Sequence, residues 1–137
     1  MKAKDIMSRN PEILSPEMTL QEAAEKMKKQ DFGFMPIGEN DRLIGAVTDR
    51  DIVIRGVASG KDSKKVTIRD IMTDKIQYCF ENDSIDKIAE MMSKLQIRRL
   101  AVLNENKRIV GIISIGDVAT KSNDNNLSGK VTAAVSC

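Results

Sequence analysis

The chain has no histidine or tryptophan, and its 137 residues include only two cysteines, three phenylalanines and one tyrosine. Without histidine, catalytic triads, zinc sites and proton shuttles at neutral pH lose their commonest participant. The two cysteines, Cys79 and Cys137, provide neither a disulfide framework nor a metal-ligand spacing. We therefore expect no catalytic residues, no metal site and no catalytic cofactor, which predicts a protein that is not an enzyme.

An excess of one charge and long apolar runs are also missing. Lys and Arg number 22 against 20 Asp and Glu, far from the basic excess of proteins that bind nucleic acid nonspecifically. No stretch approaches the roughly 18 to 20 consecutive apolar residues of a membrane span, and the N-terminus leads into no signal-peptide core. These features predict a cytoplasmic protein that has neither nucleic acid nor a membrane as a partner.

The chain contains one unit twice. Asp5-Ile6-Met7 recurs 65 positions later as Asp70-Ile71-Met72, and from about position 38 the offset is 66, so that Asp51 matches Asp117. A repeat of this kind indicates one structural unit in two copies. We delimit a first domain at 1–58, a linker at 59–66, a second domain at 67–122, and a tail at 123–137 that is either a short helix or disordered.

Each copy predicts a helix, two strands and a second helix. The first helix of each copy has one apolar face with helical spacing, formed by Leu20, Ala23, Ala24 and Met27 and by Ile85, Ile88, Ala89 and Met92. Thr19 with Glu22 predicts a capping box, and Ser84 predicts the equivalent N-cap. Strands are expected at 34–37, 43–47, 100–103 and 109–113. A copy of about 56 residues is marginal alone, so we expect the two copies to pack together.

Duplicated motifs in matching order carry a family resemblance. Asp5-Ile6-Met7, the run Gly-Ala-Val-Thr-Asp-Arg-Asp-Ile at 45–52 and the run Gly-Ile-Ile-Ser-Ile-Gly-Asp-Val at 111–118 resemble CBS domains. Their tandem arrangement resembles a Bateman module. The resemblance implies an α+β fold of two β-α-β-β-α repeats packed with pseudo-twofold symmetry, commonly as a homodimer. It also implies a regulatory ligand such as AMP, ADP, ATP or S-adenosylmethionine, bound in two clefts between the copies.

The resemblance places the ribose of that ligand on the Thr/Ser-x-x-Asp motif of each copy, which means Thr48 with Asp51 and Ser114 with Asp117. The chemistry fits, because an ionised carboxylate can accept hydrogen bonds from vicinal ribose hydroxyls. The other interpretation needs no ligand: Thr or Ser caps the final helix and Asp is the acid of the capping box. Both interpretations can hold together.

The resemblance also implies an adenine pocket formed by Ile13, Val47, Tyr78 and Ile113. The phosphate-binding candidates are Arg98, Arg99 and Arg50, because a guanidinium group offers a planar fork to phosphate oxygens. For each arginine a surface salt bridge is the alternative.

The two copies differ near these residues, which predicts two clefts that are not equivalent. Ala101 stands where the first copy has Pro36, and Gly116 stands where it has Arg50.

The sequence therefore predicts a stand-alone nucleotide sensor that signals to an unidentified effector protein by a conformational or oligomeric change. The alternative is a ligand-free interaction or dimerisation module in which the Thr/Ser-x-x-Asp pairs are only helix caps. A nucleotide hydrolase using Asp51 and Asp117 is disfavoured, because the sequence has no metal-ligand cluster, glycine-rich phosphate loop or activated nucleophile.

Overall fold

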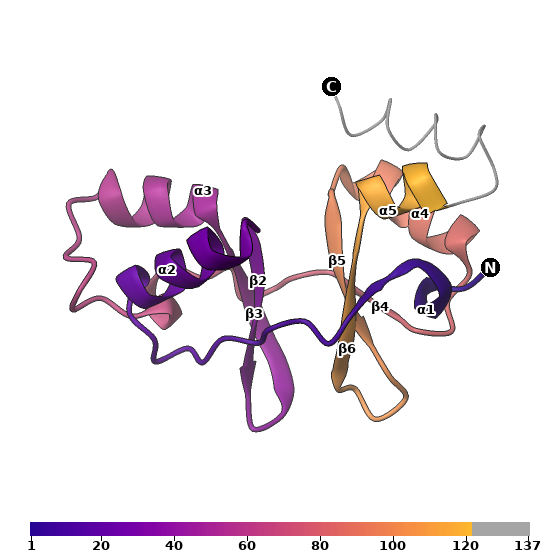
Figure 1. The fold of residues 1–137 in the computed structure, drawn as a ribbon, viewed down its shortest axis with the longest axis horizontal. Helices are drawn as coiled ribbons and strands as arrows, with labels where there is room; N and C mark the ends of the chain where they lie inside the picture. The colour runs from indigo at the N-terminus through magenta and orange to yellow at the C-terminus, as the bar shows by residue number, and fades with distance from the viewer. Residues whose placement is uncertain (122–137) are drawn as a thin grey trace. The chain divides into compact units, whose positions relative to one another are not determined.

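The computed structural model describes residues 1–121, so the predicted tail and Cys137 lie outside the described residues. The chain divides into two compact units (Figure 1). Unit 1 contains residues 1–11 together with the described residues from 77 onward, and unit 2 contains residues 12–76. Each unit therefore combines residues from both sequence copies.

Unit 2 is built on a β-hairpin of β2 (Phe34–Glu39) and β3 (Arg42–Thr48). The hairpin turn places Asn40 and Asp41 at φ values of 53° and 61°, the left-handed conformation that a tight two-residue turn requires. The remaining elements are α2 (Leu20–Gln30), α3 (Asp49–Asp51), the π-helical η1 (Ile52–Val57) and the 3₁₀-helical η2 (Ile68–Asp70). Single bridges extend the hairpin on both sides: Leu14 pairs with Ile37 in parallel, and Thr73 pairs with Ala46 in antiparallel orientation.

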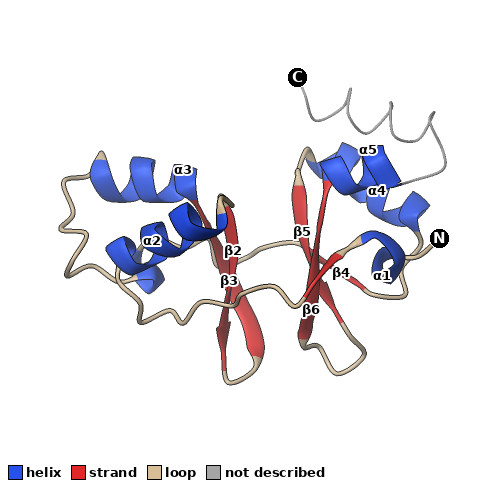
Figure 2. Cartoon of the chain, viewed as in Figure 1, coloured by secondary structure: helices blue, strands red, loops and turns tan. Residues whose placement is uncertain are grey.

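Unit 1 has a four-stranded sheet in the order β1-β6-β5-β4; Figure 2 labels its strands β4, β5 and β6. Its strands are β1 (Ser8–Arg9), β4 (Tyr78–Phe80), β5 (Arg99–Leu103) and β6 (Ile109–Ser114). Its helices are α1 (Ala3–Ile6), α4 (Ile85–Leu95) and α5 (Ile115–Lys121). The pairing of β4 with β5 is parallel, and the other two pairings are antiparallel. The strand arrangement repeats that of unit 2, where the two single bridges stand in the places of β1 and β4.

The predicted helices and strands are present, and so are the predicted caps of the first helices. The hydroxyl of Thr19 accepts a hydrogen bond from the Glu22 amide at 3.2 Å, and the Glu22 carboxylate accepts one from the Thr19 amide at 3.1 Å. The hydroxyl of Ser84 accepts one from the Lys87 amide at 3.2 Å. The expectation that Ala24 lies on the buried face is wrong: Ala24 is exposed, because the buried stripe of α2 contains only Leu20, Ala23 and Met27.

Each unit has its own aliphatic core between its sheet and its helices. The core of unit 1 includes Ile6, Ile88, Met92, Leu100, Val102 and Ile113. The core of unit 2 includes Leu14, Leu20, Met35, Ile37, Val47 and Ile71. Burying these side chains provides the main driving force for folding of either unit.

The two sequence copies exchange their Asp-Ile-Met segments. Residues 3–9 pack in unit 1 with the strands of the second copy, and residues 68–73 pack in unit 2 with the strands of the first copy; we call these two stretches the exchanged segments. Ile6 and Ile71 are 2% and 1% exposed, so each exchanged segment contributes a core residue. The repeat boundaries at 58 and 67 and the boundaries of the compact units at 11 and 76 therefore divide the chain differently.

A glycine in the last strand of each unit makes room for the exchanged segment. A Cβ atom on Gly45 would lie 2.5 Å from the Thr73 carbonyl oxygen, and one on Gly111 would lie 2.8 Å from the Ser8 carbonyl oxygen. Real Cβ atoms do not approach a backbone oxygen so closely, and backbone cannot move aside as a flexible side chain can. The glycines of the two repeated motifs are therefore required by the exchange.

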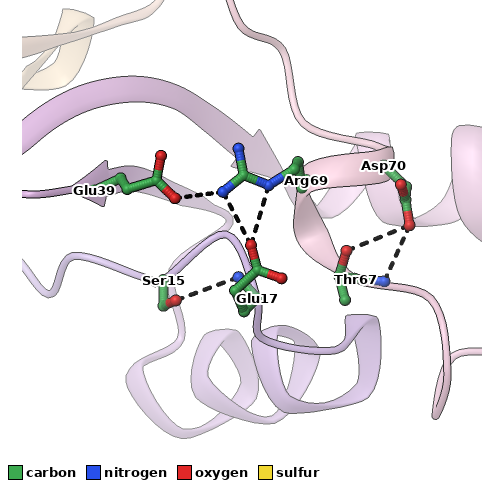
Figure 3. A network of polar contacts seen from close by, with 6 residues as sticks. All are labelled: Ser15, Glu17, Glu39, Thr67, Arg69 and Asp70. Carbon is green, nitrogen blue, oxygen red and sulfur yellow. Dashed lines mark hydrogen bonds and ion pairs between the residues drawn. The ribbon is translucent and has the colours of Figure 1, made fainter.

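Charged side chains also hold the exchanged segment in unit 2 (Figure 3). The Arg69 guanidinium donates to Glu17 Oε1 from Nε at 3.1 Å and from Nη2 at 2.9 Å, and it forms an ion pair with Glu39. Hydrogen bonds to Glu17 and then to Glu39 raise the pKa of Arg69 above its usual value. Next to Arg69, Thr67 and Asp70 form a capping box around η2.

Replacing either strand glycine with alanine will destabilise the protein, because the added methyl group meets the backbone of the exchanged segment. We expect Gly45→Ala and Gly111→Ala each to lower the free energy of unfolding by about 1–3 kcal/mol, measured by urea denaturation. The matched control is Gly116→Ala in α5, where the new Cβ would lie 3.5 Å from Ser114 Oγ, an ordinary contact. A strand variant as stable as this control would contradict the role of the glycines.

Candidate functional site

In unit 2 the first candidate pair, Thr48 and Asp51, joins the end of β3 to α3. The Thr48 hydroxyl accepts a hydrogen bond from the Asp51 amide at 3.0 Å, and Asp51 Oδ2 accepts one from the Thr48 amide at 3.0 Å. Thr48 has extended backbone angles, as an N-cap residue requires. The capping interpretation of this motif is therefore confirmed.

Unit 1 repeats this geometry with Ser114 and Asp117 at the junction of β6 and α5. The Ser114 hydroxyl accepts a hydrogen bond from the Asp117 amide at 3.0 Å, and Asp117 Oδ2 accepts one from the Ser114 amide at 2.9 Å. The two aspartate side chains are 16% and 14% exposed in unit 2 and unit 1 respectively. Each unit thus presents a mostly buried carboxylate whose Oδ2 atom is held by the backbone.

The second oxygen of each carboxylate distinguishes the two units. Asp51 Oδ1 lies 4.0 Å from Arg55 Nε, which is beyond hydrogen-bond distance, whereas Asp117 Oδ1 lies 3.1 Å from Lys121 Nζ. A carboxylate oxygen can accept more than one hydrogen bond, so either Oδ1 atom can receive a hydroxyl group. The cation lies farther from Oδ1 in Asp51 than in Asp117, so Asp51 Oδ1 is the more available hydrogen-bond acceptor.

The three candidate arginines are exposed but differ in position. Arg99 is the ladder partner of Ser114, so the two side chains lie on the same face of the sheet. Arg98 precedes the strand, and its carbonyl accepts a hydrogen bond from the Ile115 amide at 2.8 Å. Arg50 is in α3 of unit 2, beside Asp51. The structure therefore places Arg99 near the unit 1 pair and Arg50 near the unit 2 pair.

The expected adenine pocket needs a correction, because Val47 and Ile113 are 0% exposed. Both side chains belong to the cores of their own units, and neighbouring residues of a strand point to opposite faces. Val47 therefore points to the opposite face of the sheet from Thr48, and Ile113 points to the opposite face from Ser114. The structure therefore does not present the side chains of Val47 and Ile113 to a ligand on the face that carries Thr48 and Ser114.

The other two adenine candidates are accessible. Ile13 is 44% exposed in unit 2, and Tyr78 is 40% exposed in unit 1. Phe80 supports the Tyr78 ring by an edge-to-face contact, with ring centroids 5.7 Å apart and planes at 86°. Unit 1 thus offers a braced aromatic ring where unit 2 offers an aliphatic side chain.

Three further residues were not found from the sequence. Phe34 is the ladder partner of Thr48 and occupies in unit 2 the place of Arg99 in unit 1. Arg55 and Lys121 each follow the aspartate of the motif by one helical turn. The repeat offset of 66 matches the latter two positions, which is the signal that could have identified them.

Comparisons with known proteins agree with the repeat. The family model for the CBS domain matches residues 3–57 and 68–124. Hypoxic response protein 1 of Mycobacterium tuberculosis is 41% identical over 118 residues, which cover 85% of this chain and 82% of that protein. CBS domain-containing protein YhcV of Bacillus subtilis is 34% identical over 133 residues, covering 97% and 94% of the two chains.

Solved structures show the same architecture. The crystal structure of Hypoxic Response Protein I, described with two coordinated zinc ions, matches with a TM-score of 0.78 at 39% identity, covering 88% of this chain and 98% of that one. The CBS domain pair of protein MJ0100, in complex with 5′-methylthioadenosine and S-adenosyl-L-methionine, matches with a TM-score of 0.77 at 30% identity, covering 87% and 93%.

The chain has no histidine, and within residues 1–121 no three Cys, Asp or Glu side chains gather where they could hold a metal ion. Cys79 in β4 is buried, and burial followed by the charge of Asp83 raises the pKa of its thiol from 9.0 to about 12. A zinc-binding or nucleophilic cysteine must be a thiolate, so Cys79 serves as a core residue. The described part of the chain also contains no helix long and apolar enough to cross a membrane.

Cys79 will make the protein sensitive to alkali. Because its folded pKa is raised, the stabilisation is complete below pH 9 and is lost as pH rises toward 12, where the unfolded chain releases the thiol proton first. In a Cys137→Ser background, the free energy of unfolding should fall with pH above 9 more steeply than in the Cys79→Ala variant, by up to about 1.4 kcal/mol per pH unit. Parallel pH profiles in urea titrations would contradict the raised pKa.

Proposed function

Since this chain belongs to the CBS domain family, we propose that it is a non-catalytic regulatory module that binds an adenosyl ligand. The observation that carries the proposal is the recurrence of one geometry in both units. Each unit holds a mostly buried aspartate by its Oδ2 atom at the junction of strand and helix. In both units the motif aspartate is mostly buried, at 16% and 14% exposed, and its Oδ1 atom takes no part in the cap.

The proposed contact is between ribose and carboxylate. A backbone amide already fixes Oδ2 of each aspartate, so the carboxylate plane is set before any ligand arrives. Oδ1 can then accept a hydrogen bond from a ribose hydroxyl, and such charge-assisted bonds are worth roughly 1.5–3 kcal/mol. In each cap the hydroxyl oxygen of Thr48 or Ser114 accepts a hydrogen bond from the amide of the motif aspartate, which holds it beside that residue. We expect the Asp51 site to bind more tightly, because within residues 1–121 no cation lies within hydrogen-bond distance of its Oδ1 atom.

The base and the phosphates have different candidates in the two units. Tyr78, braced by Phe80, provides a ring on which adenine can stack in unit 1, and Ile13 provides an apolar contact in unit 2. The phosphate candidates are Arg98 and Arg99 in unit 1 and Arg50 in unit 2. The structure of the MJ0100 relative contains two adenosyl compounds that have no phosphate group. The proposed binding of an adenosyl group therefore does not depend on whether the ligand of this chain carries phosphate.

We propose that the ligand is AMP, ADP, ATP or another adenosyl compound, used as a regulatory ligand in the cytoplasm. The output would pass to an effector protein through a change in conformation or in a homodimer. A ligand shifts such an equilibrium only by the difference in its affinity for the two states. The alternative is the ligand-free interaction module, which the completed caps would serve equally well.

The ribose contact predicts a selective loss of affinity. Asp51→Asn keeps an oxygen for the Thr48 amide but presents an amide donor where the ribose hydroxyl must donate, so AMP and methylthioadenosine should bind roughly tenfold or more weakly. Isothermal titration calorimetry on Asp51→Asn and Asp117→Asn, with 2′-deoxy-AMP as a second probe, measures the loss at each site.

The neighbouring acid provides the control. The Asp49 carboxylate is exposed and accepts a hydrogen bond from the Arg50 amide at 2.8 Å, and it belongs to neither motif, so Asp49→Asn should leave ligand affinity unchanged. If the folded wild-type protein binds no adenosyl compound, the ligand-free interaction module replaces the proposal. Equal binding of AMP and 2′-deoxy-AMP would refute the assignment of the ribose to the aspartates.

Stacking on Tyr78 predicts an optical signal. Tyr78 is the single tyrosine of a chain without tryptophan, so intrinsic fluorescence reports on this one ring. A ligand that stacks on it should quench the emission, and Tyr78→Phe should retain binding while losing the signal. Saturation of the unit 1 site without any change in emission would contradict the assignment of adenine to Tyr78.

A further inference from the structure

A cation follows each motif aspartate by one helical turn and lies within 4.0 Å of two kinds of group. One group is the aspartate carboxylate, and the other is a backbone carbonyl of the exchanged segment. The cation is Arg55 in unit 2 and Lys121 in unit 1, and both are about half exposed on their side chains, at 52% and 48%.

In unit 2 the contacts come from different atoms of one guanidinium group. Arg55 Nη1 donates to the Ile71 carbonyl oxygen at 3.3 Å and to the Met72 carbonyl oxygen at 3.4 Å. Arg55 Nε lies 4.0 Å from Asp51 Oδ1. The next residue of the exchanged segment, Thr73, is hydrogen-bonded to Ala46 of β3 in both directions at 2.9 Å.

In unit 1 a single ammonium group makes both contacts. Lys121 Nζ donates to the Ile6 carbonyl oxygen at 3.2 Å and lies 3.1 Å from Asp117 Oδ1. Ile6 ends α1, so its carbonyl has no partner within that helix and is a natural site for a cation. The exchanged segment then continues into β1, which pairs with β6.

The correspondence between the units is stronger evidence than either pair alone. Positions 55 and 121 match at the repeat offset of 66, and Ile71 and Ile6 match at 65. The contact is kept although one cation is Arg and the other is Lys, and although η1 is π-helical while α5 is α-helical. An incidental surface ion pair would not repeat its second contact, to the exchanged segment, in both units.

We propose that Arg55 and Lys121 are positioning residues that couple the motif aspartates to the docking of the exchanged segments. Each cation interacts with both a carboxylate and a backbone carbonyl. A change in the charge or hydrogen bonding of the carboxylate therefore changes the strength of the hydrogen bond from the cation to the exchanged segment. On the proposed function, a ribose hydroxyl that donates to Oδ1 is such a change. Ligand binding then changes the stability of the exchanged segment, more strongly in unit 1, where the cation touches Oδ1 directly.

The coupling can be measured first without any ligand, by amide hydrogen exchange followed by NMR. In unit 2 the readout is the Thr73 amide, and the double-mutant cycle combines Asp51→Asn with Arg55→Met. In unit 1 the readout is the amides of β1, and the cycle combines Asp117→Asn with Lys121→Met. Coupling should make the cycles non-additive by roughly two- to fivefold in exchange rate, the range of a partly exposed ion pair.

Controls distinguish positioning from plain structural support. Each cycle should leave the readout in the other unit unchanged, and Arg55→Lys and Lys121→Arg should restore the wild-type behaviour. Additive effects in both cycles would overturn the proposal, since they mean that the cation holds the segment without sensing the carboxylate.

The ligand arm adds AMP or methylthioadenosine to the wild type and to the two methionine variants. A saturating ligand should change the exchange rate of the segment amides in the wild type, and this change should vanish in Arg55→Met and Lys121→Met although the ligand still binds. A ligand-induced change that survives in these variants would overturn the proposal. If no ligand binds while the cycles stay non-additive, the proposed function fails and the coupling stands.

Discussion

Both units depend on the contact between a last strand and a segment that belongs to the other sequence copy. The hydrogen bonds of Thr73 with Ala46 close one edge of the unit 2 sheet, and β1 closes the equivalent edge in unit 1. Ile71 and Ile6 carry the same segments into the two cores. Because each segment is short and has little helix or strand of its own, its position is determined by these contacts.

This constraint determines where the candidate site lies. The strand that receives the exchanged segment ends at Thr48 or Ser114, which begins the helix carrying the aspartate. The strand glycine allows the segment to approach, and the cation one turn into the helix reaches the carbonyls of that segment. The aspartate, the cap and the exchanged segment thus form one connected group in each unit. On the proposed coupling, a ligand bound at the carboxylate would change the stability of the segment through this group.

Much of the fold could be predicted from the sequence. The duplicated motifs predicted two equivalent units, and alternation and helical spacing predicted the strands, the helices and the caps of Thr19 and Ser84. The exchange could not be predicted, because a repeat shows that two segments are equivalent without showing which copy each one packs against. The alternation rule also predicts that Val47 and Ile113 point away from Thr48 and Ser114, as the structure has them, whereas Ile13 and Tyr78 are accessible and stay candidates for the adenine pocket. The ribose assignment of Asp51 and Asp117 stays a prediction, because a capping box is complete with or without a ligand.

The measurement that tests the exchange most directly is a nuclear Overhauser experiment on uniformly labelled protein, read at the two exchanged segments. If the segments are exchanged, short-range contacts will appear between Thr73 and Ala46 and between Ser8 and Ile112. Contacts of Ser8 with Ala46 and of Thr73 with Ile112 would mean instead that each copy folds with its own segment, and that result would contradict the account.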